Sequence, residues 1–134
     1  MNVFLFQNRF EAPIVAGVKL TTIRAHRKDG RPRAKIGEEF SLRVWTGRPY
    51  ASKQREIARG IMEQMEAVAV HDDGVSLGDG TLRAMWIGER NRYVILYSVA
   101  KREGFADWKE MRAHFAEHHA LPFSGTLFTW RLAK

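Results

Sequence analysis

Short strand-like segments recur along the chain and restrict it to a fold with a small sheet. Residues 3–6 are a continuous apolar run, and residues 40–45 alternate apolar with polar side chains, the patterns of a buried and a half-buried strand. Residues 57–70 fit both a helical spacing and an alternation, and we interpret them as a strand. Further strands are expected over 75–77, 82–87 and 125–132, with a Gly-Asp-Gly turn between the first two.

Three segments favour helices. Residues 11–17 begin near a proline and end at a glycine, which predicts one or two helical turns. Residues 93–100 repeat apolar side chains at helical spacing, and Asp107 with Glu110 resembles the capping box that opens a helix. Residues 25–36 combine glycine, proline and many like charges, so a loop is expected there. The combination predicts an α+β domain with a small, curved or closed sheet.

Length and composition set further limits. With 134 residues, the chain is expected to form a single domain, residues 1–134. The absence of cysteine excludes disulfides and thiolate metal sites, and it fits a reducing cytoplasm. The first residues lack the basic and long apolar regions of a signal peptide, and no segment approaches the ~20 apolar residues of a membrane span. We therefore expect a cytoplasmic protein without a membrane partner.

The positive charge is concentrated in one part of the sequence. The chain carries a formal net charge of +7, and the segment from Lys19 to Arg59 contains twelve basic and four acidic residues. Such asymmetry is typical of a protein that binds a polyanion, most often nucleic acid. The alternative is a solvated basic loop that only keeps the protein soluble. The side chains expected to contact nucleic acid are Arg27, Lys28, Arg31, Arg33, Arg48, Lys53 and Arg55.

The run from Gly17 to Arg24 places an amine, on Lys19, three residues before a hydroxyl, on Thr22. The β-branched residues of this run favour extended backbone, and on a regular strand these two side chains would point to opposite faces. If both serve one pocket, the backbone must turn or bulge between them, and Gly17 makes such a departure easier. The alternative is an edge strand with a solvated lysine.

Further short motifs accompany this run along the chain. In sequence order the set is Phe6–Phe10, Pro13–Lys19, Thr22–Arg24, a loop ending at Gly37, Glu103–Trp108, and Phe123–Gly125 leading to Trp130. The ordered set, with its Gly-x-Lys-x-x-Thr-Ile-Arg core, resembles the pattern of ASCH domains (activating signal cointegrator homology) and covers nearly the whole chain. The resemblance implies a PUA-like fold, which is a small twisted β-barrel flanked by two or three helices, with a cleft that faces the basic loop. It also implies work related to RNA.

Some ASCH proteins that this chain resembles are amidohydrolases that remove an acyl group from the exocyclic amine of cytidine, with N4-acetylcytidine as the typical substrate. The resemblance assigns their functional lysine, threonine and glutamate to Lys19, Thr22 and Glu103. Amide cleavage needs a nucleophile, a base, an acid for the departing amine and donors for the oxyanion. Lys19 could act as the base toward Thr22 only with a lowered pKa. Glu103 could hold the lysine and protonate the leaving amine, or it could activate a water directly, so the nucleophile is left open between Thr22 and water.

Other side chains could complete such a site. Arg24 could pair with Glu103, orient a substrate oxygen, or form an ordinary surface ion pair. Aromatic side chains could stack on a base, although on strands they more often belong to the core. The aromatic candidates are Phe6, Trp45, Tyr50 and Trp86.

His114 and His118 have a spacing that can bind metal, but no third ligand lies near them in the sequence, so neither a metal nor another cofactor is expected. His118 and His119, next to Glu117, more simply form a solvated helix end. Three functions follow: an amidohydrolase acting on an acylated cytosine nucleoside, a non-catalytic RNA-binding module and, ranked last, a ribonuclease for single-stranded RNA that uses His26. A monomer is favoured over an oligomer.

Overall fold

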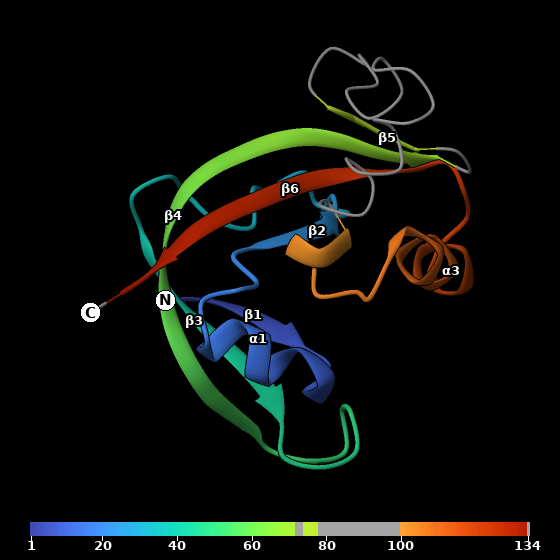
Figure 1. The fold of residues 1–134 in the computed structure, drawn as a ribbon. Helices are drawn as coiled ribbons and strands as arrows, with labels where there is room; N and C mark the ends of the chain where they lie inside the picture. Colours follow the sequence, from blue (N-terminus) through green and yellow to red (C-terminus); the bar gives the residue numbers. More distant parts are fainter. Residues whose placement is uncertain (72–73, 78–99, 134) are drawn as a thin grey trace.

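One long bent strand organises the sheet of this protein, for which a computed structural model describes residues 1–71, 74–77 and 100–133. This strand is β4 (Gln54–His71), and the sheet order is β1-β3-β4-β6-β2, with β5 also paired to β4 (Figure 1). The other described strands are β1 (Asn2–Phe6), β2 (Thr21–Ala25), β3 (Glu39–Trp45), β5 (Gly74–Leu77) and β6 (Phe123–Leu132). β1 runs parallel to β3, whereas the other described pairs are antiparallel.

The sheet curls because β4 changes partners along its length. Its first half pairs with β3, and its second half pairs with β6. The register shifts after Leu42 in β3 and after Met62 in β4, and irregularities of this kind bend strands. Gly60 lies near the second shift, where an added Cβ atom would come within 2.8 Å of the Phe40 ring. The sheet therefore forms the half-barrel curl that Figure 1 shows.

Aromatic side chains fill the inside of this curl. The Phe4 ring on β1 contacts Phe40 on β3 and Phe128 on β6 edge-on, with centroids 5.2 and 5.0 Å apart. Trp130 packs against Phe40 and Phe6 and is almost fully buried. The contacts of Phe128 and Trp130 join β6 to β1 and β3, which are not its neighbours in the sheet order, so the aromatic core holds the curl together.

Helices occupy the connections between strands. Within the described ranges they are the 3₁₀ helix η1 (Asn8–Phe10), α1 (Glu11–Val15) and α3 (Trp108–His118), and residues 100–102 are also helical. In Figure 1, α1 lies near β1, and α3 lies close to the start of β6. The residues between 100 and α3 pass near β2, which brings the second half of the chain to the Lys19 region.

The start of α3 agrees with its predicted capping box. The Asp107 carboxylate accepts a hydrogen bond from the Glu110 backbone N–H at 2.8 Å, and the Glu110 carboxylate accepts one from the Ala106 N–H at 3.0 Å. The first bond satisfies an amide that the first turn of a helix leaves unpaired, and the second ties the residue before the cap to Glu110. Met111 and Phe115 are buried on the inner side of the helix, as their spacing predicts.

Most predicted elements are confirmed. Strands are present at the positions predicted for 3–6, 40–45, 57–70, 75–77 and 125–132, and α1 accounts for the helical turns predicted at 11–17. The 25–36 loop contains no helix or strand beyond Ala25, which ends β2. The strand expected at 82–87, the turn before it, Trp86 and most of the helix expected at 93–100 lie outside the described residues. The fold is therefore of mixed α+β class with a curled, barrel-like sheet.

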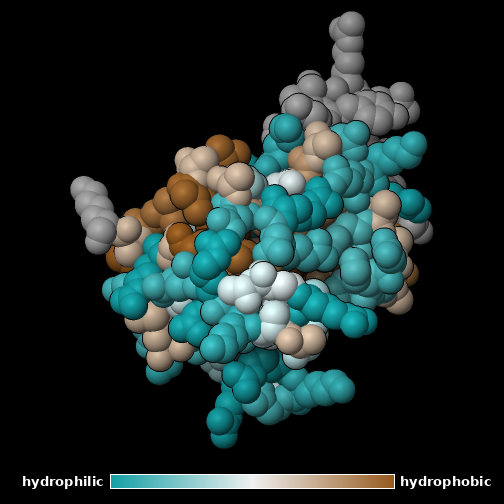
Figure 2. All heavy atoms as spheres, turned by 90° about the horizontal axis from the view of Figure 1, so that it is seen from below, coloured by the Kyte–Doolittle hydropathy of each residue, from teal (hydrophilic) through white to brown (hydrophobic). Residues whose placement is uncertain are grey.

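The surface seen in Figure 2 is mostly hydrophilic, and its hydrophobic residues gather toward one side of that face. Large apolar side chains that are exposed in the described ranges include Met1, Val3, Val15, Val18, Ile36 and Tyr50. Among the described residues, no helix is both long and apolar enough to cross a membrane.

Candidate active site

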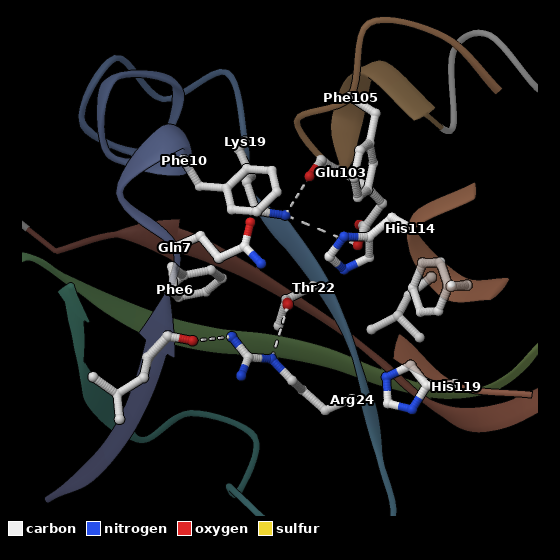
Figure 3. Close-up of a pocket in the computed structure, with 13 residues that line it drawn as sticks. Phe6, Gln7, Phe10, Lys19, Thr22, Arg24, Glu103, Phe105, His114 and His119 are labelled. Carbon is white, nitrogen blue, oxygen red and sulfur yellow. Dashed lines mark hydrogen bonds and ion pairs between the residues drawn. The ribbon is translucent and has the colours of Figure 1, made fainter. Parts of the chain in front are cut away.

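A cavity of about 200 Å³ opens between the two edge strands of the sheet and the residues that lead into α3. Five of the residues predicted for the site line it, namely Phe6, Lys19, Thr22, Arg24 and Glu103. We call it the Lys19 cavity. Figure 3 shows these side chains converging from β1, from β2 and its preceding turn, and from the segment before α3.

A turn before β2 brings Lys19 and Thr22 to the same cavity. Gly17 adopts a left-handed backbone with φ of 74°, and the next two N–H groups, of Val18 and Lys19, both donate to the Pro13 carbonyl at 2.9 Å. The strand begins only at Thr21. Lys19 therefore precedes the regular alternation of β2, which is the departure from a regular strand that a shared pocket requires.

The Lys19 amine is enclosed by carbonyl groups and a carboxylate. The side chain is 3% exposed, and its Nζ donates to the carbonyl oxygens of Glu103 and Thr21 at 2.6 and 2.8 Å. Glu103 Oε1 lies 3.9 Å from Nζ. Burial lowers the pKa of Lys19 to about 8; the Glu103 carboxylate opposes this shift and the nearby Arg24 cation adds to it. A substantial fraction of the amine is therefore neutral at mildly alkaline pH.

This environment suits a lysine that exchanges a proton. A neutral amine has two N–H groups, and the two carbonyl oxygens can accept both, which leaves the nitrogen lone pair to accept a proton. The protonated form is stabilised as well, because the centroids of the Phe6 and Phe10 rings lie 5.6 and 5.0 Å from Nζ and aromatic faces attract a cation. Both protonation states of Lys19 thus have partners in the same position.

Glu103 is fixed by a hydroxyl that the sequence analysis did not single out. Its side chain is buried, and Oε2 accepts a hydrogen bond from the Thr21 hydroxyl, not from Thr22. Because Thr21 is the first residue of β2, its side chain and that of Thr22 point to opposite faces of the strand. Thr21 therefore holds one carboxylate oxygen while the other faces Lys19.

Arg24 joins the two edge strands of the curled sheet. Its Nε donates to Thr22 Oγ1 at 3.1 Å, and its Nη2 donates to the Leu5 carbonyl of β1 at 2.6 Å. The guanidinium also lies over the Phe6 ring at 4.7 Å. Within the described part of the chain Arg24 forms no ion pair, so the predicted pairing with Glu103 is replaced by these contacts.

Arg24 is held in a cationic environment. Burial lowers its pKa to about 10, and repulsion from Arg33 lowers it further, whereas Glu103 and Tyr50 act in the opposite direction. The Thr22 hydroxyl consequently faces a guanidinium whose charge is not neutralised by a bonded carboxylate.

Two predicted stacking residues lie outside the Lys19 cavity. Trp45 ends β3, and Tyr50 lies in the turn before β4, is 90% exposed and has a left-handed backbone with φ of 62°. Their rings contact each other with centroids 5.2 Å apart. Of the predicted aromatic residues, Phe6 therefore contributes to the cavity wall and these two do not.

The predicted nucleic-acid contacts are divided between two regions. Arg27, Arg31 and Arg33 line a second cavity of about 220 Å³ beside the end of β2, and Lys28 is exposed in the same loop. The others lie around the β3–β4 turn and the start of β4, where Arg48 and Lys53 are exposed and Arg55 forms an ion pair with Glu11.

The Lys19 cavity is also lined by residues that were not predicted as site residues, namely Leu5, Gln7, Phe10, Ile23, Phe105, His114, Phe115 and His119. The His114 ring lies 5.1 Å from Phe105, and its pKa is lowered to about 4 by burial and by His118. Its position could have been inferred, because residue 114 lies three after Met111 and therefore on the buried face of α3.

His114 and His118 have ring centroids 4.5 Å apart. Over residues 1–71, 74–77 and 100–133, no group of three or more histidine, aspartate or glutamate side chains is arranged to hold a metal ion. The His114 ring instead packs against Phe105 and Phe115, and the His119 ring lies 4.3 Å from Phe123.

Comparison of the chain with known protein families, with curated proteins and with solved structures found no match. The geometry of the site and the resemblance of its motifs are therefore the grounds on which a function can be proposed.

Proposed function

We propose that this protein is an amidohydrolase that removes an acyl group from the exocyclic amine of an acylated cytosine nucleoside, such as N4-acetylcytidine. The observation that supports this most directly is the buried Lys19 amine, with its lowered pKa, beside Glu103 in a small cavity. A general base works best when its pKa lies near the working pH. The ASCH resemblance supplies the substrate class, and Phe6 in the wall offers an apolar surface to a planar base.

In the proposed reaction, neutral Lys19 removes the proton of the Thr22 hydroxyl, and Thr22 Oγ1 adds to the acyl carbon of the substrate. Thr22 Oγ1 accepts a bond from Arg24 Nε, so its own proton remains available for this transfer. The C–N bond then breaks, and the cytosine amine takes the proton held by Lys19. Lys19 next takes a proton from water, whose oxygen adds to the acyl carbon; the bond from that carbon to Thr22 Oγ1 then breaks, Oγ1 receives the proton from Lys19, and the acyl group leaves as a carboxylic acid. Glu103 keeps Lys19 in position throughout.

The test is incubation of the protein with N4-acetylcytidine, followed by chromatographic detection of cytidine. Lys19→Arg keeps the positive charge but removes the proton acceptor, and we expect turnover to fall by ~10²–10⁴-fold. Glu103→Gln keeps the size of the side chain and should also reduce turnover. Thr22→Ser, which retains a hydroxyl, should remain more active than Thr22→Val. Retained turnover in Lys19→Arg would show that another group is the base.

A non-catalytic RNA-binding module is the second candidate, and the basic segment from Lys19 to Arg59 favours it. In that case Lys19→Arg would leave RNA affinity nearly unchanged, since attraction to phosphate needs only charge, and the affinity would fall steeply with salt. Absence of deacylation on every acylated cytidine tested, together with salt-sensitive RNA binding, would favour the binding module over the enzyme.

A further inference from the structure

The loop that follows β2 encloses a second cavity of about 220 Å³, which we call the arginine cavity. Met65 and Phe128 contribute apolar surface to it. Its titratable and cationic lining residues are His26, Arg27, Arg31 and Arg33. Three guanidinium groups around one small space form a strongly positive site.

This charge is only partly compensated. Asp29 is the acidic residue of the loop, and its carboxylate pairs with Arg27 at 2.9 Å and accepts a bond from the Arg31 backbone N–H at 3.0 Å. Within the described part of the chain, neither Arg31 nor Arg33 forms an ion pair. The half-buried Arg33 is fixed by its Nε, which donates to the Ala25 carbonyl at 2.9 Å. Its two terminal nitrogens have no acceptor among the described residues, so none of these residues competes with a ligand for them.

The positive charge of the arginine cavity extends along β2 to the Lys19 cavity. Ala25 lines the former and Arg24, the preceding residue of β2, lines the latter. Arg33 is close enough to repel the Arg24 guanidinium and lower its pKa. Neither arginine forms an ion pair among the described residues, and like charges this close favour binding of an anion, which would relieve the repulsion.

We propose that the arginine cavity binds a phosphate ester of the substrate, so that the protein acts on a phosphorylated acylcytidine and not on the free nucleoside. The inference rests on the proposed function for the identity of the base. Planar guanidinium groups bind phosphate oxygens in pairs, and they do so for a nucleotide monoester and an RNA diester alike. The base then occupies the Lys19 cavity, and its phosphate lies beyond Arg24 at the other end of β2.

Binding is tested first, by calorimetric titration of the protein with cytidine 5′-monophosphate and with cytidine. We expect the monophosphate to bind about tenfold or more tightly, since a hydrogen bond to a charged group has an effect of this order. Arg31→Ala and Arg33→Lys should both reduce this preference. The Arg31 side chain is exposed, so its removal leaves the fold intact. Arg131→Ala changes the same charge at an exposed position of β6 and should leave the preference unchanged.

Turnover then separates the two sources of phosphate. Wild-type protein and the same variants are assayed with N4-acetylcytidine, its 5′-monophosphate and a short RNA that contains N4-acetylcytidine. We expect kcat/KM to be higher for one or both phosphorylated substrates, and Arg31→Ala should lower that advantage where Arg131→Ala does not. If none of the three is deacylated, the proposed function fails, and the titration still decides the phosphate site. Equal affinity of the wild-type protein for cytidine and its monophosphate would overturn the inference.

Discussion

Lys19 carries its amine where burial penalises the charged form, and the surroundings compensate this penalty only in part. Two carbonyl oxygens and a carboxylate stabilise the ammonium, yet desolvation is the larger effect and lowers the pKa to about 8. A lysine that served only to attract an anion would function better in an exposed position. The buried position is therefore consistent with a group that must lose its proton.

The pH dependence of the unfolding free energy should reflect the lowered pKa of Lys19. In the unfolded chain a lysine titrates near ~10.4, so between about pH 8 and about pH 10.4 the unfolded state binds more protons than the folded state. Stability linked to Lys19 therefore rises with pH across this window, by about 2–3 kcal/mol in total. We expect the unfolding free energy of the wild type to rise relative to that of Lys19→Met between pH 8 and pH 10, as measured by urea denaturation.

The matched control for this measurement is Lys109→Met, which removes a lysine at an exposed position of α3. Its unfolding free energy relative to wild type should stay nearly constant over the same pH range. If both variants gave the same pH dependence, the lowered pKa of Lys19 would be wrong.

At the residue level, sequence patterns located the site but not its contacts. The family resemblance predicted that Lys19 and Thr22 serve one site. The Lys-x-x-Thr spacing and the conformational freedom of Gly17 indicated only that such a shared pocket requires a turn or bulge between the two residues. They could not predict that Thr21, and not Thr22, binds Glu103, because that depends on where β2 begins. Nor could they place Glu103 beside Lys19 without the family resemblance, because 84 residues separate the two in the sequence.

At the level of elements, the connection between residues 100–102 and α3 positions Glu103. This connection requires glycine at position 104 for two reasons. The backbone φ of 94° is left-handed, and an added Cβ would lie 2.7 Å from the Phe10 ring and 3.1 Å from Lys19 Cδ. The glycine thus allows the segment to pass directly over the lysine side chain. Any larger residue would move one of these neighbours.

Gly104→Ala should therefore affect both stability and turnover. We expect a loss of about 2 kcal/mol or more, from the left-handed backbone and from crowding against Phe10 and Lys19. Gly37→Ala is the control, since its φ of 86° is equally left-handed but nothing lies within 4 Å of an added Cβ, and it should cost about 1 kcal/mol. Thermal unfolding and the deacylation assay are measured for both. Equal effects on turnover would mean that Gly104 does not position Lys19.

The elements themselves were largely predictable, because their signals are local. The Asp107 cap and the inner face of α3 follow from side-chain spacing, and the 57–70 segment was correctly interpreted as a strand. The bend of β4 was not predicted, since the register shift after Met62 depends on pairing with β6 rather than on the sequence of β4 alone.

At the level of the whole molecule, the curl of the sheet brings its two edge strands together at the site. The Arg24 side chain of the edge strand β2 donates to the Leu5 carbonyl of the other edge strand, β1, and Phe4 of β1 also contacts Phe128 of β6, the neighbour of β2. The Lys19 cavity and the arginine cavity lie at successive positions along β2. The basic segment and Lys19, which are neighbours in the sequence, therefore remain neighbours in the fold.

The most direct test of a catalytic Lys19 is the pH dependence of kcat/KM for deacylation of N4-acetylcytidine or its 5′-monophosphate. Only the neutral amine can accept a proton, so kcat/KM should rise tenfold per pH unit below about pH 8 and level off above it. The Lys19→Arg protein should lack this rise along with most of its activity. A wild-type profile that is flat from about pH 6 to pH 9, or a rise that persists in Lys19→Arg, would contradict the assignment of Lys19 as the base.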